Sequence, residues 1–392
     1  MSLSARPLLA AMSKNGFDQK AFDNLNASIQ ADIDTGRIFG ASIIVARNGK
    51  IGLRKTFGTV TPEGRPAADD DLYLTMSVSK SFTAALVLRA IDEGRFTLDT
   101  KVAEIIPEMA AAGKGAITIR QCLNHTAGLF PGHMFPGLNA TDAVNLEKTV
   151  KAIAPLPVAY VAGTRCAYAP ISGYAVLGRI LEVTDPKQRS FSEITRQDLF
   201  EPLGMKDTIY GLDGNNPHRV PISHTPREST PQTQASEQIL SIIVGDGSGC
   251  PAAGAWSTVD DTFRFAETMR LRGNNGHYRL LSESLFDYAC KIHTGDLSND
   301  TLAFERIERG VPDFPANFSL LGGYVRGEGH FLTAGTTASP DAFFAIGGGS
   351  TMWFVDPKRD FTFVFYSAGL LTGLAHLQRL SRLADLALAA CD

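Results

Sequence analysis

The hydrophobic pattern near the start of the chain predicts a helix followed by a β-hairpin. Four apolar residues recur at intervals of three or four positions, the spacing of one face of a helix: Phe22, Leu25, Ile29 and Ile33. Residues 40–58 (GASIIVARNGKIGLRKTFG) then form two runs joined at Asn48-Gly49, a dipeptide typical of tight hairpin turns. We therefore expect the chain to open with a helix and two antiparallel strands.

The end of the chain shows a related pattern. Residues 351–369 (TMWFVDPKRDFTFVFYSAG) predict a strand, a turn through Asp356-Pro357 and a second strand rich in Phe and Val. Residues 370–390 (LLTGLAHLQRLSRLADLALAA) predict a closing helix.

The middle of the chain carries helical rather than strand patterns. Apolar residues at helical spacing recur near residues 80–93, 172–184, 190–201 and 258–271. Residues 212–237, rich in Pro, Asn, Thr, Ser and Gln, predict a long surface loop, either a plain connector or part of the mouth of a site.

Together these patterns predict an α+β fold in which the N- and C-terminal segments form one antiparallel sheet flanked by helices. A largely helical domain is inserted between those segments. We place the sheet domain at residues 1–75 plus 245–392 and the helical domain at residues 76–244, with the candidate active site between them.

Composition narrows the class of protein. With 392 residues, 44% hydrophobic and 20% charged, the chain can bury a large core. A formal charge of −4, without a run of basic residues, argues against a nucleic-acid partner. The cysteines are odd in number and never spaced as CxxC, which favours free thiols in a reducing compartment over a disulfide framework or zinc site: Cys122, Cys166, Cys250, Cys290 and Cys391.

Targeting signals are sparse. The first 16 residues hold an apolar run of six residues, shorter than the core of about 7–15 residues that a signal peptide needs. No stretch approaches the roughly 20 apolar residues that span a membrane. We therefore expect a soluble cytoplasmic protein with no membrane partner, and leave a homo-oligomer open.

The segment from Leu74 to Gly94 (LTMSVSKSFTAALVLRAIDEG) places Ser77 and Lys80 where an apolar, buried helix begins. Residues three apart share one helix face, so the hydroxyl and the amine can touch. A serine becomes a nucleophile when a base takes its proton, and a lysine can do so where burial disfavours the ammonium form. The backbone N–H of Ser77, at a helix start, is also placed to stabilise an oxyanion. The alternative is a helix cap beside a solvated lysine, since S-x-x-K alone is a weak motif.

Rival chemistries have little support. The chain contains no G-x-S-x-G, HExxH, GxGxxG or GxxxxGK[ST] motif, and no histidine pairs with another or with cysteine at a metal spacing. His125 is either a catalytic base or, as we favour, a histidine that fixes a turn. The run Asp69, Asp70 and Asp71 predicts a solvated turn. No metal and no cofactor are implied.

Five ordered segments resemble the serine β-lactamase-like family, which includes class C β-lactamases, D-alanyl-D-alanine peptidases and family VIII esterases. The segments are MSVSKSFTAALVLRAIDEGRFTLDTKVAEIIPEM, ITIRQCLNHTAGL, YAPISGYAVLGRILE, EPLGMKDT and WSTVDDTFRFAETM, and the likeness spans roughly residues 20 to 385. The resemblance implies that Ser77 is the acylated nucleophile, that Lys80 handles its proton, and that Tyr168 shares the base and acid duties. It leaves open whether Lys80 or Tyr168 is the base.

Two departures from the family pattern bear on the substrate. β-Lactamases and peptidases have Tyr-x-Asn at this motif. Here Ala169 and Pro170 follow Tyr168, and this proline resembles the esterase-type members. Ala345 and Ile346 stand where the third motif carries Lys, His or Trp, so the cation for a substrate carboxylate is missing. Both losses point away from penicillins and peptidoglycan stems, towards neutral, rather apolar esters.

The candidate substrate-binding residues flank these motifs. Gly347, Gly348 and Gly349 leave a bare backbone that lets a substrate carbonyl approach, with one N–H as the second oxyanion donor, unless they form only a bulge in an edge strand. Phe130 and Trp256 are candidate pocket walls, although base rates favour the core for such residues.

The sequence therefore predicts a serine hydrolase that forms an acyl-Ser77 intermediate on small-molecule carboxylic esters or lactones, with acyl transfer to an alcohol or amine left open. The alternatives are an amidase, a weak β-lactamase or D-Ala peptidase, and a non-catalytic member that binds ligands. The intact Ser77, Lys80 and Tyr168 argue against the last of these.

Overall fold

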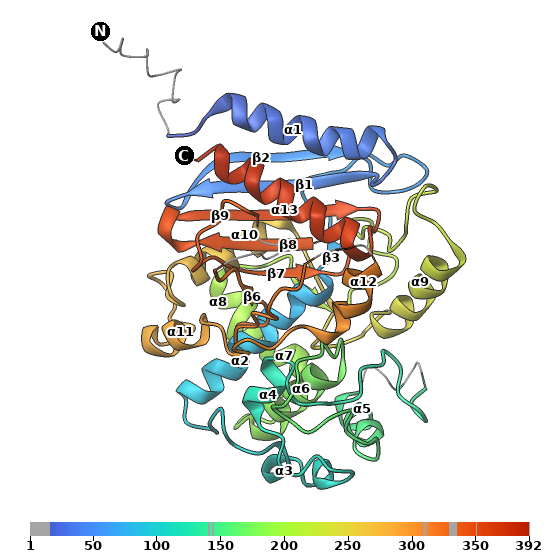
Figure 1. Ribbon diagram of the computed structural model, residues 1–392, viewed down its shortest axis with the longest axis vertical. Coiled ribbons are helices and arrows are strands. Elements are labelled where there is room, and N and C mark those ends of the chain that lie inside the picture. Colours follow the sequence, from blue (N-terminus) through green and yellow to red (C-terminus); the bar gives the residue numbers. More distant parts are fainter. Residues whose placement is uncertain are drawn as a thin grey trace.

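The computed structural model describes residues 16–139, 142, 145–308, 310, 312–328, 335–349 and 351–391. Its centre is a six-stranded sheet in the order β2-β1-β9-β8-β7-β6, with every neighbouring pair antiparallel (Figure 1). The strands are β1 (Gly40–Arg47), β2 (Lys50–Gly58), β6 (Tyr324–Val325), β7 (Phe343–Gly347), β8 (Thr351–Asp356) and β9 (Phe361–Ala368).

Both predicted hairpins are present, and they lie side by side. Asn48 and Gly49 join β1 to β2 with φ values of 50° and 72°, and two consecutive positive φ values match the twist of a tight hairpin. The strands β1 and β9 pair from Gly40 with Ala368 to Arg47 with Phe361, so the two ends of the chain share one sheet. This confirms the predicted α+β fold with an antiparallel sheet from both terminal segments.

Side-chain alternation along the strands gives the sheet two buried faces. Along β9, Phe361, Phe363 and Phe365 join the core beneath α1 (Gln19–Asp34) and α13 (Gly373–Ala389). Val364 and Tyr366 point to the opposite face and join the larger core that includes α10 (Val259–Arg270). In Figure 1, α13 crosses in front of the sheet and α10 lies behind it.

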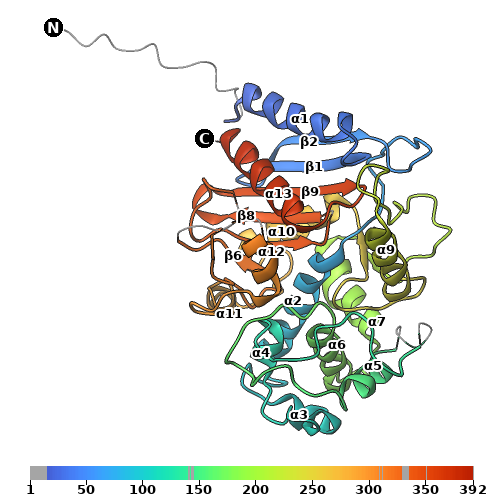
Figure 2. The ribbon, with the colours of Figure 1, turned by 45° about the vertical axis from the view of Figure 1, so that its right-hand side comes forward.

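The helical part lies on the side of the sheet away from β2 (Figure 2). Its central helix α2 (Ser79–Asp92) is buried on most faces, as its apolar sequence predicts. The surrounding helices are α3 (Val102–Ile105), α4 (Ile119–Leu123), α5 (Leu146–Ile153), α6 (Ser172–Thr184), α7 (Phe191–Thr195) and α8 (Glu201–Leu203). The remaining helices are α11 (Glu283–Ala289) and α12 (Ala303–Glu308).

Two elements differ from the sequence prediction. A small sheet in the order β3-β5-β4 links the two parts through β3 (Tyr73–Leu74), β4 (Ile209–Tyr210) and β5 (Ala255–Ser257). These strands are too short to give a period-two signal. The predicted loop 212–237 is partly wrong, because α9 (Pro231–Ile243) begins inside it. Thr230 caps that helix in a capping box with Thr233, and Pro231 suits its first position.

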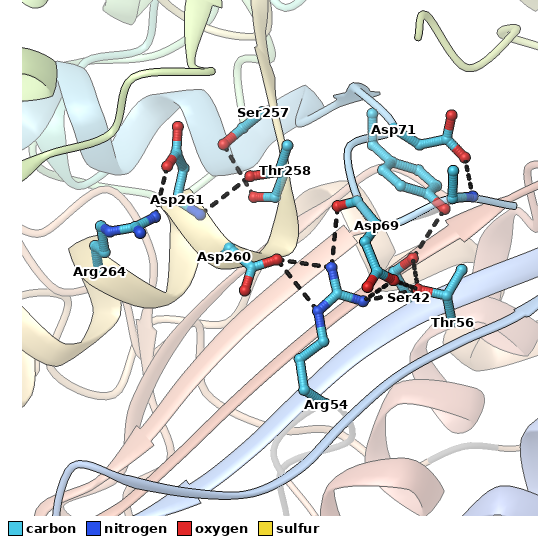
Figure 3. A network of polar contacts seen from close by, with 12 residues as sticks. Ser42, Arg54, Thr56, Asp69, Asp71, Ser257, Thr258, Asp260, Asp261 and Arg264 are labelled. Carbon is cyan, nitrogen blue, oxygen red and sulfur yellow. Dashed lines mark hydrogen bonds and ion pairs between the residues drawn. The ribbon is translucent and has the colours of Figure 1, made fainter.

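Arg54 on β2 organises a polar network between the sheet, the loop that joins β2 to β3, and α10 (Figure 3). Its guanidinium donates to Asp260 on α10 at 2.7 and 3.2 Å, and to Asp69 at 2.7 Å. The aspartate run is therefore only in part a solvated turn. Asp69 is exposed, but Asp71 is buried, with Arg65 Nη1 at 2.6 Å and the Ala68 amide at 2.7 Å.

The division into residues 1–75 plus 245–392 and residues 76–244 stays a prediction. Residues 1–15, on which the expectation of a missing leader depends, lie outside the described residues, as does residue 392. Among the described helices, none is long and apolar enough to cross a lipid bilayer.

Candidate active site

Ser77 lies in a one-turn 3-10 helix, Met76–Val78, that leads directly into α2, rather than in the first turn of α2 itself. The turn is held by β5, since Thr75 donates its N–H and its hydroxyl to the Ala255 carbonyl at 2.8 and 2.9 Å. Met76, beside the serine, has φ of 51°, a conformation that side chains rarely adopt. Packing therefore holds the turn that carries Ser77 in a strained shape.

Two polar groups meet the Ser77 hydroxyl. Lys80 Nζ lies 3.1 Å from Ser77 Oγ, and the Tyr168 hydroxyl lies 2.5 Å from the same atom. Both are normal distances for hydrogen bonds. The structure therefore brings together the three residues that the sequence analysis selected from distant segments.

Lys80 is 1% exposed, and its amine has few other partners. It donates to the Ala252 carbonyl at 2.9 Å and lies over the rings of Tyr168 and Tyr174, at 5.1 and 5.4 Å from their centroids. Burial, with a further contribution from Lys80, holds the pKa of His125 well below its usual value. His125 is therefore a neutral ring beside Lys80.

The ring of Tyr168 is positioned by aromatic neighbours. The centroid of the His125 ring is 4.4 Å away and that of Phe318 is 6.1 Å away. The main chain of His125, at φ of 60°, forms the predicted turn by accepting hydrogen bonds from the Tyr160 hydroxyl and the Ala167 amide. Ser77 Oγ has Lys80 and Tyr168 as its side-chain partners, which fits the positioning role for His125 rather than the role of base.

The end of β7 lies against the nucleophile turn. A Cβ at Gly347 would stand 2.0 Å from Thr351 Oγ1 and 2.3 Å from the Thr75 carbonyl oxygen, so only glycine permits this approach. Within the described residues, β6 pairs with β7 only at Phe343 and Phe344. The last residues of β7 therefore form a free sheet edge beside Ser77, with the glycines at its end.

A pocket of about 470 Å³ opens above Ser77. The residues that line it come from both parts of the fold: Met76, Ser77, His133, Tyr168, His224, Ser236, Ile239, Leu240, Thr301, Phe318, Gly322, Tyr324, Ile346, Gly348, Gly349, Leu370, Thr372, Gly373, His376 and Leu377. None of these described lining residues is Lys, Arg, Asp or Glu. Within the described part of the chain, no cluster of three metal-ligating side chains occurs.

The predicted substrate-binding residues do not all reach this pocket. Gly348 and Gly349 line it, and Gly347 lies directly behind them against Thr75. Phe130 instead packs on Phe135, with ring centroids 6.0 Å apart. Trp256 is fully buried in β5 beneath Arg219. Neither side chain lines the pocket. Trp256 belongs to the larger hydrophobic core, and Phe130 packs against that core.

Sequence reasoning left residues 212–237 open as part of the mouth of a site, but it named no residue of the wall formed by α9 and the start of α13. His224 and Ser236 come from the segment that was predicted as a loop, and His376 comes from the closing helix. Isolated histidines carry no local signal for a site. Only the pairing of distant segments reveals that they face Ser77.

Comparison with known proteins agrees with this geometry. The family model described as Beta-lactamase matches residues 25–387. Esterase EstB of Burkholderia gladioli is 26% identical over 327 residues, which cover 72% of this chain and 80% of EstB. A putative D-alanyl-D-alanine carboxypeptidase of Escherichia coli K12 is 24% identical over 404 residues, with 94% and 87% covered.

Solved structures show the same fold. EstCE1, described as a hydrolase with promiscuous acyltransferase activity, superposes with a TM-score of 0.73 at 19% identity, covering 94% of this chain and 99% of its own. Because the family model matches nearly the whole chain, the chain belongs to the Beta-lactamase family of serine hydrolases.

Proposed function

We propose that the chain is a carboxylesterase that acts through an acyl-Ser77 intermediate on neutral, largely apolar esters or lactones. The observation that carries the proposal is the meeting of Ser77 Oγ with Lys80 and Tyr168 at 3.1 and 2.5 Å, beneath a pocket whose described lining holds no charged side chain. The similarity to esterase EstB supports the same class of substrate.

The proposed reaction has two steps. Ser77 Oγ attacks the ester carbonyl while Lys80 or Tyr168 takes its proton, and the oxyanion forms near the N–H of Ser77 and the glycine edge of β7. The leaving alkoxide receives the proton and departs as an alcohol. Water, or another alcohol, then attacks the acyl-enzyme, and its proton returns by the same groups to restore the serine.

The pocket wall argues against anionic substrates. Ile346 lines the pocket at the position where the resemblance would place a cation, and Ala345 is buried. A substrate carboxylate would therefore lose its water shell without a salt bridge in exchange. For this reason we rank β-lactam and D-Ala peptidase activity well below ester hydrolysis. We rank the non-catalytic alternative lower still, because Ser77, Lys80 and Tyr168 are all in contact.

A fluorophosphonate probe tests the covalent step. We expect stoichiometric labelling of the native protein by intact mass, and no labelling of Ser77→Ala. Equally poor labelling of both proteins would support the non-catalytic alternative.

Paired substrates test the proposed class. We expect kcat/KM for p-nitrophenyl butyrate to exceed that for nitrocefin by at least about a hundredfold, because none of the described residues that line the pocket is a Lys or Arg that could pair with the β-lactam carboxylate. Comparable values would contradict the neutral-ester assignment.

A further inference from the structure

Two histidines line the pocket with unused ring nitrogens. The side chain of His224 is 1% exposed, and His376, in the first turn of α13, is 4% exposed as a residue. In each ring Nε2 is buried and has no hydrogen-bond partner among the residues that the structure describes. A buried, unpaired polar atom costs about 1–3 kcal/mol. Other described atoms of this kind, such as Trp256 Nε1, lie in the core, whereas His224 and His376 line the pocket, where a ligand can reach them.

The surroundings of His224 settle its tautomer. Glu237 on α9 places Oε1 at 2.6 Å from His224 Nδ1, and the same oxygen accepts the backbone N–H of His224, also at 2.6 Å. A carboxylate oxygen only accepts hydrogen bonds, so Nδ1 carries the proton. In the neutral ring, Nε2 then presents a lone pair and is an acceptor.

His376 has the opposite arrangement. Arg379, one turn along α13, places a guanidinium nitrogen at 3.4 Å from His376 Nδ1, and a guanidinium only donates. Burial and the Arg379 charge lower the pKa of His376 to about 3. An interaction with the Gly347 backbone opposes them, but it falls outside hydrogen-bonding geometry for Nε2, which stays unpaired. The ring is therefore neutral, with its proton on Nε2, which is a donor.

Both rings belong to the same side of the pocket. The Leu370 amide donates to the Ser223 carbonyl at 2.8 Å, next to His224, and the Leu371 amide donates to the Gly349 carbonyl at 3.0 Å. Arg379 donates to that same Gly349 carbonyl at 2.9 Å. The glycine edge, the start of α13 and the segment before α9 are thus tied together at this wall.

We infer that this wall is a neutral subsite for a hydroxyl group of the ester substrate, donating to His224 Nε2 and accepting from His376 Nε2–H. The inference rests on the proposed esterase function and names its substrate class, hydroxylated esters. A hydroxyl fits because it donates and accepts at once. A carboxylate only accepts, so it would face the His224 lone pair, and an alkyl group would leave both nitrogens unpaired.

Matched esters test the subsite and locate the hydroxyl. One pair places it in the acyl group: p-nitrophenyl 3-hydroxybutyrate against p-nitrophenyl 3-methylbutyrate, where a methyl replaces it. A second pair places it in the alcohol: 2-hydroxyethyl butyrate against propyl butyrate. We expect the hydroxylated ester of one pair to have at least about tenfold higher kcat/KM, since a site built for a hydroxyl discriminates against analogues without one.

Variants assign that preference to the two rings. We expect the ratio of kcat/KM values within the preferred pair to fall towards one in His224→Leu and in His376→Leu, each checked for folding by circular dichroism. If one variant does not fold, the other decides. His133→Leu is the matched control, because His133 lines the same pocket but is solvent-exposed, and we expect it to keep the native ratio.

Three outcomes would overturn the inference: a ratio near one for both pairs, a ratio that survives both substitutions, or a preference for a monosuccinate ester over the hydroxylated ones. Fluorophosphonate labelling of Ser77 in the same preparations distinguishes failure of the subsite inference from failure of the proposed esterase function. Labelling with no hydroxyl preference removes the subsite alone, whereas absent labelling removes the esterase proposal as well.

Discussion

The network around Arg54 and the pocket above Ser77 both contain polar side chains from distant segments, but the two regions differ in whether those polar atoms have hydrogen-bond partners. Every guanidinium nitrogen of Arg54 has an acceptor, supplied by Thr56, Asp69 and Asp260 (Figure 3). In the pocket, by contrast, His224 and His376 each keep a buried nitrogen without a partner in the described residues.

We interpret this difference as one between a structural cluster and a candidate functional one. Complete pairing stabilises one arrangement and leaves nothing to bind a ligand. Unpaired nitrogens, the strained φ of Met76 and the buried Lys80 all carry a free-energy cost, and they occur in or beside one pocket. Breaking each region in turn should therefore change activity in the pocket and stability in the network.

The largest effect is expected at Lys80. Replacing it by Met keeps the volume but removes the amine beside Ser77, and we expect kcat/KM for p-nitrophenyl butyrate to fall about 10³-fold or more. Circular dichroism should still show a folded protein. Turnover within tenfold of the native value would contradict the assigned role.

The glycine edge offers a matched pair. In Gly347→Ala the new Cβ would collide with Thr351 Oγ1 and the Thr75 carbonyl, whereas in Gly348→Ala it meets only the flexible end of Met76, at 3.3 Å. We expect Gly347→Ala to lose about 10²-fold in kcat, because displacement of β7 misaligns the site, and to melt several degrees lower. Gly348→Ala should keep a nearly native melting temperature, and equal melting temperatures would refute the close-packing argument.

Acid should weaken the fold through the pocket. The pKa of His376 is about 3 in the folded protein, against about 6.5 in an unfolded chain. Between these two pKa values the ring is protonated in the unfolded chain and neutral in the folded protein. The free energy of unfolding therefore falls as pH decreases, by about 1.4 kcal/mol per pH unit.

Urea unfolding at pH 6 and pH 4 checks this expectation. His376→Leu removes the titrating ring, and its stability should depend on pH less steeply by about that amount. The same slope in both proteins would show that the ring titrates normally.

The smallest effect is expected in the network. Arg54→Met removes contacts to two partly exposed carboxylates, Asp69 and Asp260, at 75% and 40% side-chain exposure. We expect about 1 kcal/mol of stability to be lost, measured by urea unfolding, with ester hydrolysis close to native. A large loss of activity without a loss of stability would mean that the network is coupled to the site.

The sequence predicted the parts of the fold that have a local cause. Helical spacing identified α1, α2 and α13, and Asn48-Gly49 identified the first hairpin with its positive φ values. The ordered motifs identified the family and selected Ser77, Lys80 and Tyr168. The three-stranded sheet and α9 were missed, since two- and three-residue strands and a polar, exposed helix have weak periodicity.

The order of residues along the chain by itself determined the sheet, the buried helix and the choice of nucleophile, because hydrophobic period, turn chemistry and motif spacing are local properties. The tertiary structure alone decided which other side chains line the pocket above Ser77. It left Phe130 and Trp256 outside the pocket and brought His224 and His376 to its wall. Such contacts depend on how separate elements pack, and no spacing within a single segment records them.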